Sequence, residues 1–321
     1  MNSYVVGMDI GGTKLATVVA DASGKILQKV RKPTETEKGP QHAVQRLLEM
    51  VDETIRLAGL KREDISAIGV SCGGPLDTKT GVIYSPPNLP GWDSLPLKAL
   101  MEAEFHIPTT IENDANAEAL AEWRFGGGRG HNYVLYMTMS TGIGGGIIAN
   151  GQIYHGANDS AGEVGHQILL PNGPLCRCGK HGCLEALCSG PAIACRAQEA
   201  IRKQPKPNTA ILELTNGNID CVKSEHVLEA VRNGDSLAIS IMQETAYYMG
   251  WGIANLVNIL NPEIVLIGTI AIAAGDLLLD PIRQIVADMA MQRPAEVVKI
   301  MPAQLGEAVG DLAAIALVID K

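Results

Sequence analysis

Aromatic residues, excess positive charge and long apolar runs are all scarce in this chain. Aromatic residues make up 4% of its 321 residues, which argues against surfaces that stack nucleic-acid bases. The net charge of −9 argues against electrostatic binding to nucleic acid or to an anionic membrane. No apolar run is long enough to span a membrane, and residues 1–4 lead into a strand without a secretory signal. We therefore expect a cytoplasmic protein that binds neither nucleic acid nor membranes.

Cysteine is present in an odd number, seven, and three of the seven lie within residues 176–183. Without a secretory signal, this grouping favours a metal site over disulfides. Three thiols and one imidazole are a common ligand set for a structural Zn²⁺ site. The thiols are Cys176, Cys178 and Cys183, and either His166 or His181 can complete the set. The carboxylates at residues 163 and 185 flank these ligands and suggest a site for a molecule rich in hydroxyls.

Hydrophobic periodicity and turn residues predict an α/β protein. Strands are expected over residues 4–9, 15–20, 25–32, 65–71, 109–112, 133–139, 146–149 and 264–267. Helices are expected over residues 41–59, 96–105, 116–125, 236–260, 280–291 and 305–318. The length favours two domains, with a boundary near residue 115. We expect an N-terminal domain of residues 1–115 and a larger one of residues 116–304, with the last helix, residues 305–321, packing back on the first domain.

Two glycine-rich turns follow buried strands, at residues 9–14 and 138–146. Glycine lets the backbone approach an anion closely, and the N–H groups of such turns can point at phosphate oxygens. Each turn alone can also be a simple hairpin. The first turn does not follow the Walker or the dinucleotide-binding glycine pattern. A pair of such turns, one in each expected domain, favours a site that grips a polyphosphate.

The pair Asn113-Asp114 follows a short strand and opens a helix. One interpretation is structural, because Asp is a good helix N-cap. The other is a general base that accepts a proton from a sugar hydroxyl as its oxygen attacks phosphorus.

With these motifs together, the chain resembles the ROK family of sugar kinases, in the actin-like ATPase and sugar kinase superfamily. The resemblance is carried by residues 9–14, 73–77, 113–114, 140–146, 163–166 and 176–185. It implies two actin-like ATPase (ribonuclease H-like) domains around a central cleft, with a structural zinc loop. It implies ATP, Mg²⁺ and a structural Zn²⁺ as cofactors, a sugar and a nucleotide as small-molecule partners, and a homo-oligomer, either dimer or tetramer.

The resemblance also implies roles for individual residues. Asp114 corresponds to the catalytic base. The sugar is expected to contact Gly74, Asn88, Asn113, Asp114, Glu163, His166 and Glu185. The nucleotide phosphates and Mg²⁺ are expected near Asp9, Gly11, Gly12, Thr13, Lys14, Thr141, Gly142, Gly144 and Gly268. The zinc ligands are expected to be His166, Cys176, Cys178 and Cys183, with His166 favoured over His181 because it completes the family's Glu-x-x-His pattern.

The sequence departs from the family after Gly268, where more glycine is usual. Here the β-branched Thr269 and Ile270 follow, and they restrict the backbone and add bulk. The departure implies a reshaped adenosine pocket, weaker ATP binding or another phosphoryl donor.

The function expected from the resemblance is ATP-dependent phosphorylation of a hexose 6-hydroxyl, with glucose first because residues 84–92 resemble a glucokinase loop. N-acetylmannosamine, N-acetylglucosamine, mannose and fructose remain alternatives. A sugar-responsive regulator is a second class, although a first strand at Tyr4 leaves no room for a DNA-binding module. A catalytically silent sugar binder is a third.

Overall fold

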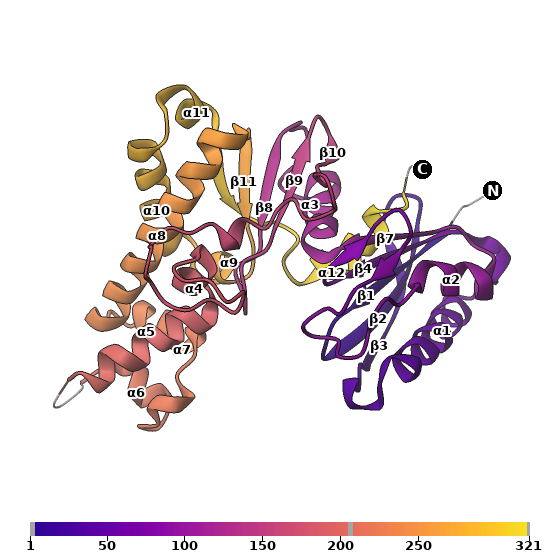
Figure 1. Ribbon diagram of the computed structural model, residues 1–321, viewed down its shortest axis with the longest axis horizontal. Coiled ribbons are helices and arrows are strands. Elements are labelled where there is room, and N and C mark those ends of the chain that lie inside the picture. Colours follow the sequence, from indigo (N-terminus) through magenta and orange to yellow (C-terminus); the bar gives the residue numbers. More distant parts are fainter. Residues whose placement is uncertain (1–3, 205–207, 320–321) are drawn as a thin grey trace. The chain divides into compact units, whose positions relative to one another are not determined.

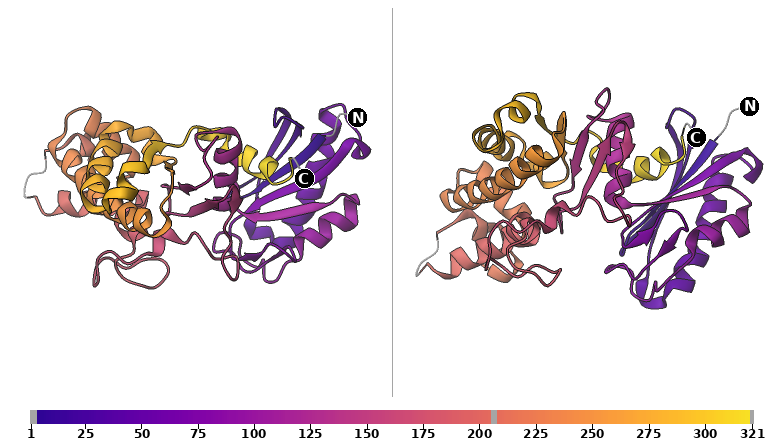
Figure 2. Two further views of the ribbon diagram at one scale, coloured as in Figure 1. Left: turned by 90° about the horizontal axis from the view of Figure 1, so that it is seen from above. Right: turned by 45° about the horizontal axis from the view of Figure 1, so that its top comes forward.

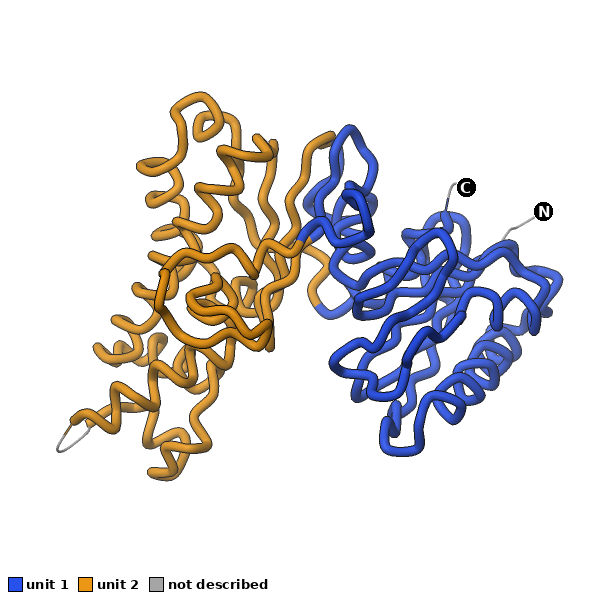
Figure 3. Tube along the Cα trace, in the orientation of Figure 1, with its two compact units in different colours: residues 1–130, 146–162, 307–321 blue, residues 131–145, 163–306 orange. Residues whose placement is uncertain are grey.

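The computed structural model describes residues 4–204 and 208–319, which form two compact units. Unit 1 comprises residues 1–130, 146–162 and 307–321, and unit 2 comprises residues 131–145 and 163–306 (Figure 3). The expected boundary near residue 115 differs from this division. Residue 115 lies inside helix α3 (Asp114–Phe125), so the chain leaves unit 1 only after that helix ends.

Unit 1 is built on a five-stranded sheet with the strand order β3-β2-β1-β4-β7 (Figure 1). Its strands are β1 (Tyr4–Ile10), β2 (Lys14–Asp21), β3 (Ile26–Pro33), β4 (Ile65–Cys72) and β7 (Thr109–Asn113). β1 and β2 pair antiparallel, as do β2 and β3, whereas β4 is parallel to both β1 and β7. The carboxyl ends of β1, β4 and β7 therefore meet at one edge of the sheet.

Alternating residues of β1 face two different helical layers, because successive side chains of a strand point to opposite faces. Val6, Met8 and Ile10 belong to the core that α1 (Pro40–Leu57) and α2 (Leu97–Phe105) cover. Gly7 faces α12 (Val309–Ala316), where a Cβ would lie 3.0 Å from Ile315 Cδ1. Glycine at this position lets α12 approach the sheet closely, and Figure 2 shows α12 beside these strands.

The remaining elements of unit 1 are short, apart from α3. They are η1 (Thr36–Lys38), η2 (Arg62–Asp64), β5 (Leu76–Asp77), β6 (Val82–Ile83), β9 (Gly145–Ala149), β10 (Gln152–Ile153) and η5 (Gly306–Ala308). α3 packs against α12. Trp92, in the loop after β6, is 2% exposed and belongs to the unit's hydrophobic core, so it anchors that loop.

Unit 2 places helices around the strand β11 (Ile264–Ile267), which pairs parallel with β8 (Val134–Met137) and β12 (Lys299–Pro302). Its helices are η3 (Val164–His166), α4 (Leu184–Cys188), α5 (Gly190–Arg202), α6 (Ala210–Leu214), η4 (Ile219–Cys221), α7 (Ser224–Arg232), α8 (Ser236–Leu260), α9 (Ile270–Ala274), α10 (Asp276–Met289) and α11 (Gln292–Val297). Asp235 caps α8 by accepting the N–H of Ala238 at 2.8 Å, and Asn261 ends the helix in the left-handed conformation. Among the described residues, no helix is long and apolar enough to cross a membrane.

Candidate active site

The carboxyl edge of the unit 1 sheet brings three predicted segments together. The register pairs Ile10 with Cys72 and Cys72 with Asn113, so the segments that follow these residues are neighbours. A Cβ on Gly74 would lie 3.2 Å from Asn113 Nδ2, and one on Gly73 would lie 3.7 Å from Asp114 Oδ2. Parallel strands thus place Gly73 and Gly74 against the Asn113-Asp114 pair.

Asn113 is the residue that caps α3, which leaves the Asp114 carboxylate available for chemistry. Asn113 Oδ1 accepts the N–H groups of Ala115 at 3.0 Å and Asn116 at 3.4 Å. Asp114 is the first residue of the helix rather than its cap, and its Oδ1 accepts the Ala115 N–H at 2.8 Å.

The surroundings of Asp114 favour a carboxylate that can bind a proton. Its side chain is exposed, yet protein atoms crowd most of its surroundings. These two observations are compatible because a carboxylate can have one open side while protein atoms surround the rest of it. Crowding raises the pKa of Asp114, and the backbone N–H of Ala115 acts against this rise.

Asp9 lies at the end of β1 and faces the start of α12. Burial raises the pKa of its carboxyl group, the charge of Lys14 opposes the rise, and Asp311 and Asp114 reinforce it. A Cβ on Gly310 would lie 3.2 Å from Asp9 Oδ2. The sequence did not single out Gly310, although a glycine in the first turn of a helix signals a close approach.

The first glycine turn is a closed hairpin that still presents two polar side chains. The Gly11 N–H donates to Lys14 O at 3.0 Å, and Thr34 Oγ1 donates to Gly11 O at 2.6 Å. The side chains of Thr13 and Lys14 are exposed. A Cβ on Gly12 would lie 2.5 Å from the carbonyl oxygen of Asn88, so this glycine also serves packing. The turn is therefore a structural hairpin whose exposed side chains can still contact a phosphate.

The second glycine turn contacts Glu185. Ile143 N–H donates to Glu185 Oε2 at 3.0 Å, and a Cβ on Gly142 would lie 2.6 Å from the same oxygen. Gly144 N–H donates to Thr138 Oγ1 at 3.0 Å, so that N–H is already bonded within the protein. Of the residues predicted to bind phosphate in this turn, the exposed Thr141 and the half-buried Gly142 can still contact one.

Packing alone accounts for Gly146, although the sequence pattern predicts that it belongs to a ligand-binding turn. A Cβ there would lie 2.5 Å from the carbonyl oxygen of Ala115 and 2.5 Å from Ala119 Cβ. Close approach to α3 therefore requires glycine at residue 146 whether or not a ligand binds.

Four side chains of unit 2 form a set that can hold a metal ion. One ligand atom each of His166, Cys176, Cys178 and Cys183 lies within 4.8 Å of the others. Cys178 Sγ is 3.7 Å from Cys183 Sγ, and Cys176 Sγ is 3.7 Å from His166 Nδ1. Ligands at about 2.3 Å from a tetrahedral Zn²⁺ are separated by about 3.8 Å, so the donor set and its spacing fit zinc.

The geometry favours His166 over His181 as the nitrogen ligand. His166 Nδ1 lies in the cluster, and its Nε2 is 3.7 Å from Glu163 Oε2. His181 Nδ1 is instead within 2.9 Å of the carbonyl oxygen of Gly173. One nitrogen of His166 can therefore bind a metal while the other faces Glu163, whose side chain is 65% exposed.

Glu185 connects the cysteine cluster with the second glycine turn. Cys176 Sγ is 3.5 Å from Glu185 Oε1, and Glu185 Oε2 receives the Ile143 N–H. The side chain of Glu185 therefore contacts both the cysteine cluster and the second glycine turn, so a displacement of Cys176 can shift that turn.

The segment after Gly268 carries backbone strain where the sequence departs from the family that it resembles. Gly268 is buried, and a Cβ there would lie 2.9 Å from Tyr136 Oη. Thr269 has φ 50° and ψ −98°, a region open to glycine and unfavourable for a β-branched residue. Ile270 is buried, and its N–H donates to Met139 O at 3.0 Å. These contacts hold Thr269 in its strained conformation.

Replacing Thr269 with glycine is expected to stabilise the protein. Relief of strain outweighs the added flexibility of the unfolded chain, giving a net gain of about 1 kcal/mol. The thermal unfolding midpoint of Thr269→Gly should rise by about 2–4 °C. Thr209→Gly is a matched control that should lower the midpoint, because Thr209 caps α6 at an ordinary φ of −149°. A lower midpoint in Thr269→Gly would refute the strain.

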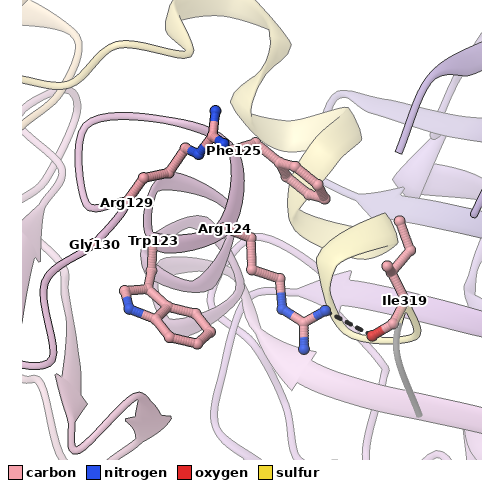
Figure 4. Close-up of a pocket in the computed structure, with 6 residues that line it drawn as sticks. All are labelled: Trp123, Arg124, Phe125, Arg129, Gly130 and Ile319. Atoms are coloured by element: carbon pink, nitrogen blue, oxygen red, sulfur yellow. Dashed lines mark hydrogen bonds between the residues drawn. The ribbon is translucent and has the colours of Figure 1, made fainter. Parts of the chain in front are cut away.

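A separate pocket lies in unit 1. Its volume is about 310 Å³, and Figure 4 shows Arg124 donating to Ile319 O at 2.6 Å beside it. It is lined by Trp123, Arg124, Phe125, Arg129, Gly130 and Ile319. None of these residues belongs to the predicted sugar, phosphate or metal sites.

Known proteins resemble this chain over nearly its whole length. The model of the ROK family matches residues 5–321. A glucokinase from Halalkalibacterium halodurans is 37% identical over 310 residues, which cover 96% of this chain and 92% of the relative.

Two solved structures share the fold. The ROK hexokinase of Thermus thermophilus has a TM-score of 0.83 at 34% identity, covering 99% of this chain and 98% of the other. A ROK family glucokinase from Streptomyces griseus, in complex with glucose and AMPPNP, has a TM-score of 0.80 at 34% identity, covering 97% of this chain and 98% of the other. The chain described here belongs to the ROK family.

Proposed function

We propose that this protein is an ATP-dependent hexokinase that phosphorylates the 6-hydroxyl of its sugar, with glucose as the first candidate. The observation that carries the proposal is the exposed carboxylate of Asp114 at the carboxyl edge of the unit 1 sheet, next to Gly73 and Gly74. The names of the relatives from H. halodurans and S. griseus support glucose.

Asp114 would accept the proton of the sugar hydroxyl as the oxygen of that hydroxyl attacks the γ-phosphorus of ATP. The P–O bond to ADP breaks in the same transfer. Asn113, Gly74 and Asn88 of unit 1 would contact the sugar, as would Glu163, His166 and Glu185 of unit 2. Carboxylates and amides suit this task, because buried polar groups that a sugar satisfies discriminate against analogues that lack a hydroxyl.

The glycine turns would bind the phosphates of the nucleotide. Lys14, Thr13 and the N–H groups of Gly12, Thr141 and Gly142 would stabilise negative charge on the transferring group. Gly11, whose N–H is already bonded to Lys14 O, would let the first turn fold close to the phosphates. Gly144 would let the second turn fold, and Gly268 would lie beside the adenosine. A bound Mg²⁺ neutralises phosphate charge. Asp9 is suited to hold this ion, because burial, together with nearby Asp311 and Asp114, disfavours its charged form, and a cation would stabilise that form.

The cysteine cluster would hold a structural Zn²⁺ through His166, Cys176, Cys178 and Cys183. The ion would fix the His166 ring and, through Cys176, the position of Glu185. All seven cysteines are free thiols, which suits a reducing cytoplasm. A homo-oligomer is part of the same proposal.

Initial rates with ATP and a panel of sugars test the proposal. We expect the highest kcat/KM for glucose, ahead of mannose, fructose, N-acetylglucosamine and N-acetylmannosamine. ATP turnover with none of these sugars, together with measurable sugar binding, would instead indicate a non-catalytic sugar binder. A clear preference for an N-acetylhexosamine would keep the reaction and change the substrate.

A further inference from the structure

A buried carboxylate, that of Glu112, lies two residues before the proposed base. Glu112 is the last buried residue of β7, and its side chain is 5% exposed. Its Oε1 accepts the backbone N–H of Asn113 at 2.9 Å and the Nδ2–H of Asn116 at 3.1 Å. These two partners stand on either side of Asp114 in the sequence. Glu112 therefore holds the backbone before Asp114 and the first turn of α3 after it.

The other oxygen of Glu112 binds a histidine from a loop far along the chain. His155 Nε2 lies 2.7 Å from Glu112 Oε2. The loop of residues 154–162 follows β10, and Asp159 in it accepts the N–H and the Oγ1–H of Thr78, each at 3.1 Å. Ala161 N–H donates to His155 O at 3.1 Å, which closes the loop. These hydrogen bonds attach the loop to two other parts of unit 1, at β7 and just after β5.

The charge of His155 depends on these neighbours. The hydrogen bond to Glu112 raises the pKa of His155 above its usual 6.5, partial burial opposes this, and the charges of Glu112 and Asp159 add to the rise. Glu112 on β7 and Asp159 on the loop itself are the charged groups that act on it. The pair is ionic while His155 is protonated and becomes a neutral hydrogen bond as the pH rises through that pKa.

We propose that His155 and Glu112 form a positioning pair, which holds the start of α3 and thereby fixes the Asp114 carboxylate for proton transfer. The inference rests on the proposed kinase function. Removing His155 leaves a buried carboxylate without its cationic partner, which is costly, and Glu112 then relaxes together with the groups that it binds. Proton transfer and in-line attack are sensitive to displacements of this kind. Neither residue touches the reacting atoms in this account, so both act through Asp114.

A second His–Glu pair in unit 1 provides a matched control. His42 Nε2 lies 2.9 Å from Glu35 Oε2, and the side chains of His42 and His155 are each 34% exposed. Glu35 is also bound by Lys38 and Arg46, and its side chain is 27% exposed. The two histidines therefore match in chemistry and exposure, whereas Glu35 is more exposed than Glu112 and the His42 pair holds no part of α3.

The test compares His155→Gln with His42→Gln in steady-state kinetics from about pH 6 to about pH 9, where histidines titrate. Wild-type kcat should fall on the alkaline side as His155 loses its proton. At pH values below this alkaline limb, His155→Gln should have a kcat about tenfold lower than the wild type. Its KM values for sugar and ATP should stay within about twofold of the wild-type values. It should also remove the alkaline limb, and His42→Gln should match the wild type. A merely structural role would lower the thermal midpoint without removing the limb.

NMR titration of the His155 imidazole gives a readout that is independent of turnover. Its pKa should lie above 6.5 in the wild type and fall in Glu112→Gln. An active wild type with unchanged kcat and pH profile in His155→Gln overturns the positioning pair alone. A wild type that phosphorylates no sugar overturns the kinase proposal and the pair's role with it, even where the NMR titration shows that the two side chains interact.

Discussion

The variant Asp114→Ala is expected to lose most of its turnover while its affinity for the sugar stays nearly unchanged. Removing a general base typically costs between 10² and 10⁴ in rate, so kcat should fall by about 10³-fold. The cap of α3 belongs to Asn113, so the helix should still form in the variant. Sugar affinity, measured by calorimetry or by quenching of intrinsic fluorescence, should change only a few-fold.

A control and a pH profile sharpen this prediction. Asp64→Asn removes a carboxylate of η2 that accepts the Lys61 N–H at 2.8 Å, outside the proposed site, and should leave kcat unchanged. Asp114 must be ionised to accept a proton, and its pKa is raised above 3.8. Activity should therefore fall as the pH drops through that raised pKa, and this acid limb should be absent from the residual activity of Asp114→Ala. Near-normal kcat in Asp114→Ala would remove Asp114 from the mechanism.

Loss of the cysteine cluster is expected to have the second largest effect. Wild-type protein should retain one Zn²⁺ per chain after dialysis, and Cys183→Ser should retain none, as measured by elemental analysis. Because ligand binding by a structural zinc contributes directly to folding, the thermal midpoint should fall by about 10 °C. The sugar KM should rise at least about tenfold, because His166 and Glu185 both depend on the cluster for their positions.

Cys195→Ser is the matched control for this experiment. Cys195 is an exposed thiol on α5 of the same unit and lies outside the cluster. Its replacement should leave zinc content, midpoint and KM unchanged. Fully active wild-type protein without bound metal would contradict the structural role of zinc.

Local patterns predicted much of the fold. The 25-residue helix α8 has the expected bounds, because its apolar periodicity and its flanking Asp235 and Asn261 mark both ends. β1, β4 and β7 are also in the expected places, so that parallel pairing brings their carboxyl ends together. The short strand β12 was not predicted, because its stability comes from pairing with β11 rather than from its own residues.

The missed features of the site depend on contacts between distant segments. Gly146 follows other glycines in a turn, and only the structure shows that α3 lies against it. Glu112 and His155 are 43 residues apart, so no local spacing indicates that they interact. The unusual Thr269 was visible in the sequence as a departure from a glycine-rich pattern, but its positive φ was not.

The most direct test of the kinase proposal is ³¹P NMR of wild-type protein incubated with ATP, Mg²⁺ and glucose. The account predicts that a glucose 6-phosphate signal grows in step with ADP and that neither grows when the sugar is omitted. ADP formation without a sugar phosphate, phosphorylation at another hydroxyl, or no transfer to any sugar of the panel would contradict it.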